Sequence, residues 1–169
     1  MNAEKLDPHI KTDLFATNTE RVLSAINRIK EKGNKHYLPM LFELLASHPK
    51  NEVEKEIVKL LGTIKSKDTV PYFADALENE KYKPIQKSIL TACWQNGLDF
   101  ADYWPLFVEI VINEKWETAF EAFTVIENMD YLPEPQIVVQ LTGQIQSALE
   151  TASGQKRYFL EEILVKIGS

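Results

Sequence analysis

Residues 52–77 read EVEKEIVKLLGTIKSKDTVPYFADAL and contain two helical patterns joined by a short polar turn. The apolar residues of the first pattern follow the three- and four-residue spacing of one helix face, and they are Val53, Ile57, Leu60, Leu61 and Ile64. In the second pattern Pro71 falls in the first helical turn, where backbone N–H groups have no helical partner. Phe73 and Leu77 then follow at helical spacing. Because the turn is short, the two helices are predicted to lie antiparallel and side by side.

The second pattern recurs with a nearly constant period. Pro39, Pro71 and Pro105 are 32 and 34 residues apart. When these prolines are aligned, three columns are apolar each time: Leu38, Val70 and Trp104 one residue before, Leu41, Phe73 and Phe107 two after, and Leu45, Leu77 and Val111 six after. A period of this length indicates a solenoid of two-helix units, because one unit cannot bury its apolar face alone and stacked neighbours can.

Helical spacing continues along nearly the whole chain and predicts one all-α domain, 1–169, of about 8–10 helices. The predicted helices are 18–32, 36–47, 51–64, 68–78, 84–96, 102–113, 115–129, 135–150 and 153–167, with a short helix after Asp7-Pro8. They group into repeats at about 18–48, 51–79, 82–113 and 115–150 and a C-terminal capping helix at 153–167.

Local signals mark several of the predicted helix ends. Thr17 with Glu20, and Asn51 with Glu54, have the spacing of N-terminal capping pairs. The glycines that are expected to end helices are Gly33, Gly97 and Gly168. The connections between helices are expected to be about two to five residues long.

Residues 52–64 followed by 68–77 resemble a HEAT repeat, in which an apolar first helix ends near Leu-Gly, an Asp lies in the turn, and a second helix opens near Pro. The matching residues are Leu61-Gly62, Asp68 and Pro71. Residues 18–47 lack the Leu-Gly, 82–113 are two residues longer, and beyond residue 115 only paired helices remain. The resemblance implies a right-handed α–α superhelix, a HEAT-like solenoid whose second helices line its concave side, and usually a protein-binding scaffold.

The net charge of −6 is distributed unevenly along the chain. Residues 98–152 contain ten acidic side chains and one basic side chain, Lys115. Binding a phosphate backbone requires a clustered basic surface. The charge distribution therefore argues against nucleic acid and favours a protein partner with a basic surface.

The sequence contains no export or membrane signal. Its N-terminus lacks a basic region followed by an apolar stretch, and no apolar run approaches the ~18 residues of a transmembrane helix. Cys93 is the only cysteine, so no internal disulfide can form. These features predict a cytoplasmic protein with no membrane partner.

The sequence also lacks a catalytic or metal-binding pattern. His9, His36 and His48 have no metal-ligand spacing with one another or with Cys93, which lies on an apolar helix face and is predicted to be buried. The glycines form no phosphate loop, and the serines no nucleophile elbow. We therefore expect no enzyme activity, no metal and no cofactor.

The proline alignment contains one further column, four residues after each proline, and it is acidic: Glu43, Asp75 and Glu109. Its position between two buried columns predicts that these side chains are exposed at the edge of the apolar stripe. In stacked helices they would form an acidic ladder. Tyr72 and Tyr103 are the tyrosines expected to contact a partner beside it. An ordinary solvated helix face is the alternative.

These features favour a non-enzymatic protein-binding scaffold or adaptor. It would bind a basic protein surface or segment through an acidic concave face, and the complementary charge would speed encounter. A more specific version is an inhibitor or immunity-type protein that caps a basic toxin or nuclease.

Two other hypotheses remain open. HEAT-like enzymes include DNA-alkylation glycosylases and bilin lyases, and a glycosylase of that kind would need a basic concave face. Alternatively, the chain is part of a longer solenoid. The final helix carries polar residues that are expected to form a terminal cap, which favours a complete protein: Gln155, Lys156, Arg157, Glu161, Glu162 and Lys166. A homo-oligomer is also compatible with the sequence.

Overall fold

A computed structural model describes residues 5–168 of the chain. In this part the chain forms ten α-helices and four 3-10 helices, helix covers 79% of it, and no strand is present. The α-helices are α1 (Pro8–Leu14), α2 (Thr19–Lys32), α3 (Leu38–Ala46), α4 (Asn51–Thr63), α5 (Val70–Glu78), α6 (Gln86–Asn96), α7 (Trp104–Asn113), α8 (Trp116–Glu127), α9 (Pro135–Leu149) and α10 (Gly154–Gly168). The 3-10 helices are η1 (Lys35–Tyr37), η2 (Lys67–Thr69), η3 (Glu80–Ile85) and η4 (Ala101–Tyr103). The predicted all-α class is confirmed.

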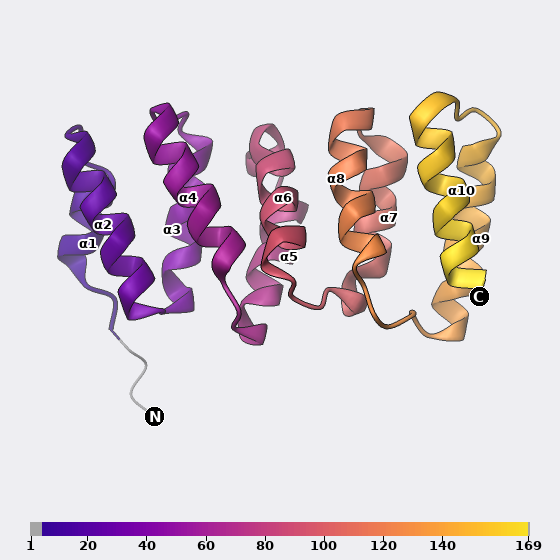
Figure 1. The fold of residues 1–169 in the computed structure, drawn as a ribbon, viewed down its shortest axis with the longest axis horizontal. Coiled ribbons are helices and arrows are strands. Elements are labelled where there is room, and N and C mark those ends of the chain that lie inside the picture. Colours follow the sequence, from indigo (N-terminus) through magenta and orange to yellow (C-terminus); the bar gives the residue numbers. More distant parts are fainter. Residues whose placement is uncertain (1–4, 169) are drawn as a thin grey trace.

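The helices stand in a row of pairs that forms two layers (Figure 1). One layer contains α2, α4, α6, α8 and α10, each of which packs against the next, and we call it the first-helix layer. The other contains α3, α5, α7 and α9, and we call it the second-helix layer. The two layers bury a common core between them.

The proline register recurs in three helices of the second-helix layer. A 3-10 turn precedes each of α3, α5 and α7, and each α-helix begins one residue before its proline. All nine residues of the three aligned apolar columns are buried: Leu38, Val70, Trp104, Leu41, Phe73, Phe107, Leu45, Leu77 and Val111. The burial predicted from the sequence alignment is therefore confirmed.

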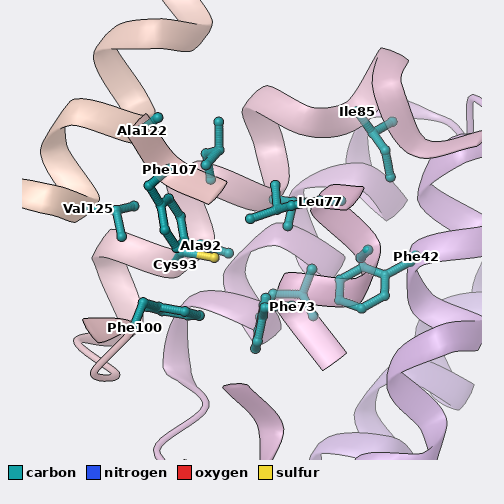
Figure 2. Close-up of a cluster of buried hydrophobic side chains, with 14 of the residues drawn as sticks. Phe42, Phe73, Leu77, Ile85, Ala92, Cys93, Phe100, Phe107, Ala122 and Val125 are labelled. Carbon is teal, nitrogen blue, oxygen red and sulfur yellow. The ribbon is translucent and has the colours of Figure 1, made fainter. Parts of the chain in front are cut away.

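A chain of phenylalanine rings runs through the core from one pair to the next. Phe42 meets Phe73 edge-on with ring centroids 5.7 Å apart, and Phe73 meets Phe100 at 6.2 Å. Phe100 in turn meets Phe107 at 5.4 Å. Edge-on pairs of this kind add stability beyond the area they bury. Figure 2 shows these rings together with Cys93, so the aromatic core is continuous across successive helix pairs.

Two predicted N-caps are wrong by one residue. The N-cap of α2 is Asn18, whose side chain accepts from the Arg21 N–H, and not Thr17. For α4 the N-cap is Lys50, and Asn51 is the first helical residue with no side-chain cap bond recorded at this end. Several neighbouring residues can satisfy the spacing of a capping pair. The spacing alone therefore does not determine which residue is the N-cap.

The predicted helix 84–96 begins later than its apolar pattern suggests. Residues 80–85 form the 3-10 helix η3, and α6 starts only at Gln86. Pro84 lies inside η3. Proline has no N–H to donate and disfavours the α conformation at the residue before it, so it is compatible with the region before a helix or with its first turn, and here it lies before α6.

Other predicted helix ends are confirmed. Asp7 caps α1 by accepting from the His9 N–H at 2.9 Å, and Pro8 occupies the first turn. Gly33 and Gly97 end α2 and α6 with φ of 65° and 69°. This left-handed conformation is strained for residues with a Cβ, which explains glycine at both positions.

A buried asparagine links two neighbouring pairs. Asn96, at the end of α6, donates from Nδ2 to the Leu61 carbonyl of α4 at 3.4 Å and accepts from the Leu98 N–H at 2.9 Å. The Lys65 ammonium donates to the Asn96 carbonyl at 2.6 Å. These bonds satisfy buried polar groups that a helix end would otherwise leave without partners.

The polar residues of the last helix do not all face outward as a cap. Lys156 donates to the Ile112 carbonyl of α7 at 2.5 Å, and Lys166 to the Glu127 carbonyl of α8 at 3.0 Å. A cation at a helix C-terminus is favourable because the last carbonyls carry partial negative charge. These two lysines therefore hold α10 against the preceding pair, while Tyr158 and Val165 of α10 are exposed.

Candidate functional site

The three acids of the predicted ladder lie on successive helices of the second-helix layer. Glu43 is on α3, Asp75 on α5 and Glu109 on α7, and all three are exposed. Each follows a fully buried residue of its own helix by two positions. The helical register alone therefore produces the exposure that the sequence predicted.

Glu43 has a cationic neighbour that the sequence alignment did not indicate. The Lys81 ammonium, on η3, lies 3.3 Å from a Glu43 carboxylate oxygen. Both side chains are mostly exposed, so solvent screens the pair and it contributes little to stability. Charge at the α3 end of the ladder is thus partly neutralised.

A groove of about 460 Å³ lies where α5 and η3 face α7. Four carboxylates line it, and they are Glu78, Glu80, Glu109 and Glu114. The one basic residue in its lining is Lys83, whose ammonium lies 2.6 Å from Glu114. We call this feature the acidic groove.

The charge of the acidic groove acts on Lys83. The hydrogen bond that the Lys83 ammonium donates to the Glu114 carboxylate raises the pKa of Lys83, and the negative charges of Glu80 and Glu109 add to this effect. Lys83 therefore stays protonated and neutralises only part of the negative charge around it. The remaining carboxylates face solvent, where they are available to a cation.

Glu109 also borders a second groove, between α7 and α9. The rest of this groove is uncharged, with Pro105, Gln140 and Gln144 in its lining. Glu109 therefore lies between the acidic groove and this otherwise uncharged groove. The structure brings it together with Glu78, Glu80 and Glu114, which the proline alignment does not contain.

The two predicted tyrosines occupy different surroundings. Tyr103 is half-buried, and its burial raises the pKa of its hydroxyl, to which the negative charges of Asp75 and Asp102 contribute. Tyr103 thus lies within electrostatic reach of Asp75, one of the ladder acids. The Tyr72 hydroxyl lies 3.0 Å from Nδ1 of His36, which is on η1, the 3-10 turn before α3. Tyr72 is therefore already engaged with the protein itself.

The residues that sequence reasoning missed come mainly from η3. This segment, Glu80–Ile85, falls outside the proline alignment, whose last column in α5 is Leu77. Its alternating charges, from Glu80 through Lys81 to Lys83, are the sequence signal that could have indicated a surface segment. Their pairing with Glu43 and Glu114 depends on long-range contacts that no local pattern contains.

The described part of the chain offers little for other kinds of site. Within residues 5–168, no group of three or more His, Cys, Asp or Glu side chains is placed to hold a metal ion. No helix in this range is long and apolar enough to cross a membrane. Burial raises the pKa of the Cys93 thiol well above its usual value, so the reactive thiolate is disfavoured.

Comparison with protein-family models found no match, and comparison with curated proteins found none either.

Proposed function

We propose that this protein is a non-enzymatic binding module whose second-helix layer binds a basic protein surface or segment. The observation that carries the proposal is the acidic groove, where four carboxylates surround one lysine that is itself paired with Glu114. A cationic side chain entering this groove would meet Glu78, Glu80 and Glu109, which form no ion pair within residues 5–168.

Electrostatics would then act chiefly on the rate of association. A surface of one sign attracts an oppositely charged partner over about a Debye length, which is ~8 Å at physiological ionic strength. It also rejects acidic competitors. The ladder acids Asp75 and Glu109 extend the negative potential of the groove along the layer, from α5 to α7.

We further propose that the architecture is a HEAT-like, right-handed solenoid. The recurrence of a 3-10 turn, a proline in the first helical turn and three buried columns supports this interpretation. Gly62 supports it too, because a Cβ at this position of α4 would lie 3.3 Å from the Cβ of Gln95 on α6, which is a tight contact. The glycine of the Leu-Gly pair thus permits close packing of successive first helices.

The charge of the groove also bears on the enzyme alternative. A DNA glycosylase on this fold would need a basic face for the phosphate backbone, and the carboxylates of the acidic groove would repel it. We therefore favour a protein partner. An inhibitor or immunity-type protein that covers a basic toxin or nuclease is the version that fits a small acidic chain, and a cytoplasmic location fits its single buried thiol.

The test is charge reversal in the second-helix layer. The variant Glu43→Lys/Asp75→Lys/Glu109→Lys should fold normally and should lose affinity for a fluorescein-labelled oligolysine peptide by about tenfold or more, which corresponds to ~1.4 kcal/mol. Fluorescence anisotropy at low and high salt measures this loss. Most of the difference should disappear at high salt.

The matched control carries the same change in charge elsewhere. Glu31, Glu56 and Glu150 are exposed, and none of them is part of the acidic groove. The variant Glu31→Lys/Glu56→Lys/Glu150→Lys should keep most of the affinity. If both triple variants lose affinity equally, only net charge matters and the ladder is an ordinary solvated face.

A further inference from the structure

The acidic groove contains a buried glutamine. Gln86 is the first residue of α6, it is only 6% exposed, and it belongs to the lining of the groove. Its side-chain amide makes no hydrogen bond to any residue of 5–168. Among the side chains of this range that are not exposed, Arg28 Nε is the one polar atom that lacks both a partner and contact with solvent. The Gln86 amide therefore retains contact with solvent, and the groove that it lines provides that contact.

Gln86 differs in its hydrogen bonding from the other buried polar residues. Within residues 5–168 these are Thr69 and Asn96. Thr69 donates from Oγ1 to the Ser66 carbonyl at 2.6 Å, and the Asn96 side chain bonds to α4 and to its own turn. Burying an amide that has no partner costs stability, and buried polar groups of folded proteins nearly always have one. The Gln86 amide therefore indicates a hydrogen-bonding partner outside this chain.

The acidic groove also supplies three carboxylates that form no ion pair within residues 5–168, and they are Glu78, Glu80 and Glu109. The lysine in the lining, Lys83, is paired with Glu114. Lys81, on the same segment but not in the lining, is paired with Glu43. A ligand in the groove therefore meets one neutral amide and an excess of negative charge, which favours a cation that donates hydrogen bonds.

Apolar side chains contribute the rest of the wall. Leu77 and Ile110 are buried, Leu106 is half-buried, and all three belong to the lining. Because Gln86 is itself buried, a group that contacts its amide must lose much of its own water. This loss is more costly for a strongly hydrated ion than for a weakly hydrated one.

These features fit a guanidinium group better than an ammonium group. A guanidinium is planar and weakly hydrated, and it carries five N–H donors in fixed directions. It can therefore donate to an amide oxygen and to a carboxylate at the same time, while the hydrocarbon stem of the arginine contacts apolar side chains. An ammonium is a compact and strongly hydrated charge, so it loses more on entering the groove.

We propose that the acidic groove binds an arginine side chain of a partner protein, and that Gln86 makes the groove prefer arginine over lysine. This inference rests on the function proposed above and names the side chain that the groove recognises. The Gln86 oxygen accepts a hydrogen bond from the guanidinium, and the carboxylates of Glu78, Glu80 and Glu109 balance its charge. The bound arginine thus satisfies an amide that the fold leaves without a partner.

The arginines of this chain argue against a second copy as the partner. The sequence contains three, and they are Arg21, Arg28 and Arg157. Arg21 and Arg28 are both paired with Asp13, and Arg157 is paired with Glu161. A second copy would have to break one of these ion pairs before its guanidinium could enter the groove. The partner is therefore a different protein.

The experiment compares the binding of fluorescein-labelled oligoarginine and oligolysine peptides of equal length by fluorescence anisotropy. The wild type should bind oligoarginine more tightly by about tenfold or more, because hydrogen bonds to a buried acceptor add to the attraction of charge. Gln86→Met removes the amide and keeps a long side chain, so this preference should fall below about threefold. The same variant should unfold at no lower urea concentration than the wild type, because the amide makes no hydrogen bond within the fold.

Gln144→Met is the matched control. Gln144 is exposed on α9 and lines the neighbouring groove that Glu109 also borders. This variant should keep the preference for oligoarginine. An equal loss in both variants would place the guanidinium in the neighbouring groove and overturn the proposal. A wild type without the preference, or a Gln86→Met variant that retains it in full, would overturn it as well.

A measurement on the wild type tests the same contact without a variant, in case Gln86→Met does not fold. In heteronuclear NMR spectra, methylguanidinium should shift the side-chain amide signals of Gln86 more than methylammonium does at the same concentration. Equal shifts, or none, would contradict the proposed contact. Free arginine that binds as tightly as oligoarginine would assign the groove to a small molecule and rule out the partner protein.

The outcomes also distinguish this inference from the function on which it rests. If neither peptide binds, or if Glu43→Lys/Asp75→Lys/Glu109→Lys leaves the affinity for oligolysine unchanged, the proposed function is wrong and the inference is wrong with it. If that triple variant loses affinity for oligolysine but Gln86→Met keeps the arginine preference, only the role of Gln86 is wrong.

Discussion

Helices α7 and α9 are neighbours in the second-helix layer, and both have a proline in their first turn, yet the residues around the two prolines differ in burial. In α7 the residue before Pro105 is the buried Trp104, and a 3-10 turn precedes the helix. In α9 the residue before Pro135 is the exposed Glu134. The described loop 128–134 leads into α9 without a 3-10 turn, and its Tyr131 carbonyl accepts from Trp104 Nε1 at 2.9 Å. It is longer than the connections that the sequence led us to expect.

The two helices also differ in the residue that lies four positions after the proline. It is Glu109 in α7 and Val139 in α9, and Val139 is 74% exposed. Helical geometry thus makes this position solvent-facing in both helices, but it does not require a charge there. The acidic ladder ends at α7. The fold therefore exposes this position but does not determine that an acidic residue occupies it.

The largest expected effect is on stability. Phe107 is fully buried two residues after its proline, whereas Ile137, at the same position of α9, is half-buried. Phe107→Ala should lower the free energy of unfolding by about 3–5 kcal/mol, because the ring leaves a cavity. Ile137→Ala should cost clearly less. Urea unfolding followed by circular dichroism measures both.

Phe73→Ala on α5 serves as a second buried case and should resemble Phe107→Ala. A loss of this size is a large share of a typical stability of about 5–15 kcal/mol. If Ile137→Ala proved as costly as Phe107→Ala, the contrast between the regular helices and α9 would be wrong.

The fold was largely predictable because its signals are local. Leu41, Phe73 and Phe107 occupy the same position after the proline in α3, α5 and α7, and all three are buried. Burial of every third or fourth residue follows from the geometry of any helix that packs on one face. Helix entrances were less predictable, as Asn18 and Pro84 illustrate, because a shift of one residue leaves the pattern of the helix unchanged. The handedness and curvature of the row depend on small rotations between pairs, which no local pattern encodes.

The candidate site was predictable only in part. Exposure of Glu43, Asp75 and Glu109 follows from the same register. Their neighbours do not, because Lys81 is 38 residues from Glu43 in the chain. The acidic groove arises where residues of η3 lie beside residues of α7, so it depends on packing between repeats.

The next effect concerns two asparagines at the ends of first-layer helices. Asn96 is buried and bridges α4 to the turn after α6, whereas Asn128, after α8, is exposed and bonds only within its own helix end among the recorded contacts. Asn96→Ala should cost about 1–3 kcal/mol because it leaves buried backbone groups without partners. Asn128→Ala should change stability by less than ~0.5 kcal/mol. Equal costs in urea unfolding would contradict the bridging role of Asn96.

The two ends of the row should differ in their response to acid. At the N-terminal end, hydrogen bonds from Arg21 and Arg28 lower the pKa of Asp13 below its ordinary 3.8. Because the folded-state pKa is lower than the unfolded one, Asp13 stabilises the fold above the unfolded pKa, and this contribution is lost as pH falls through the folded pKa. Asp13→Asn should therefore be less stable than wild type at pH 7 and approach it below about pH 4.

The C-terminal end provides the control. Lys156 donates to the Ile112 backbone carbonyl, which is not an ionisable group. The stability difference between wild type and Lys156→Met should therefore stay constant between neutral and acidic pH. Thermal unfolding at a series of pH values measures both variants, and a pH-independent effect of Asp13→Asn would show that its ion pairs contribute nothing.

The smallest expected effect tests whether α9 can be made to continue the ladder. Val139→Glu places a fourth acid at the position equivalent to Glu109, and the site is exposed enough that stability should change by less than ~0.5 kcal/mol. In water, two unit charges about 10 Å apart interact by roughly 0.4 kcal/mol, which is a factor of about two in rate. The association rate with oligolysine at low salt, measured by stopped-flow fluorescence, should rise by about that factor if the ladder is a binding surface. Val165→Glu adds the same charge to an exposed site on α10, in the other layer, and should raise the rate less. An equal gain in both variants would mean that the probe responds to net charge alone, and the difference between α7 and α9 would then have no bearing on binding.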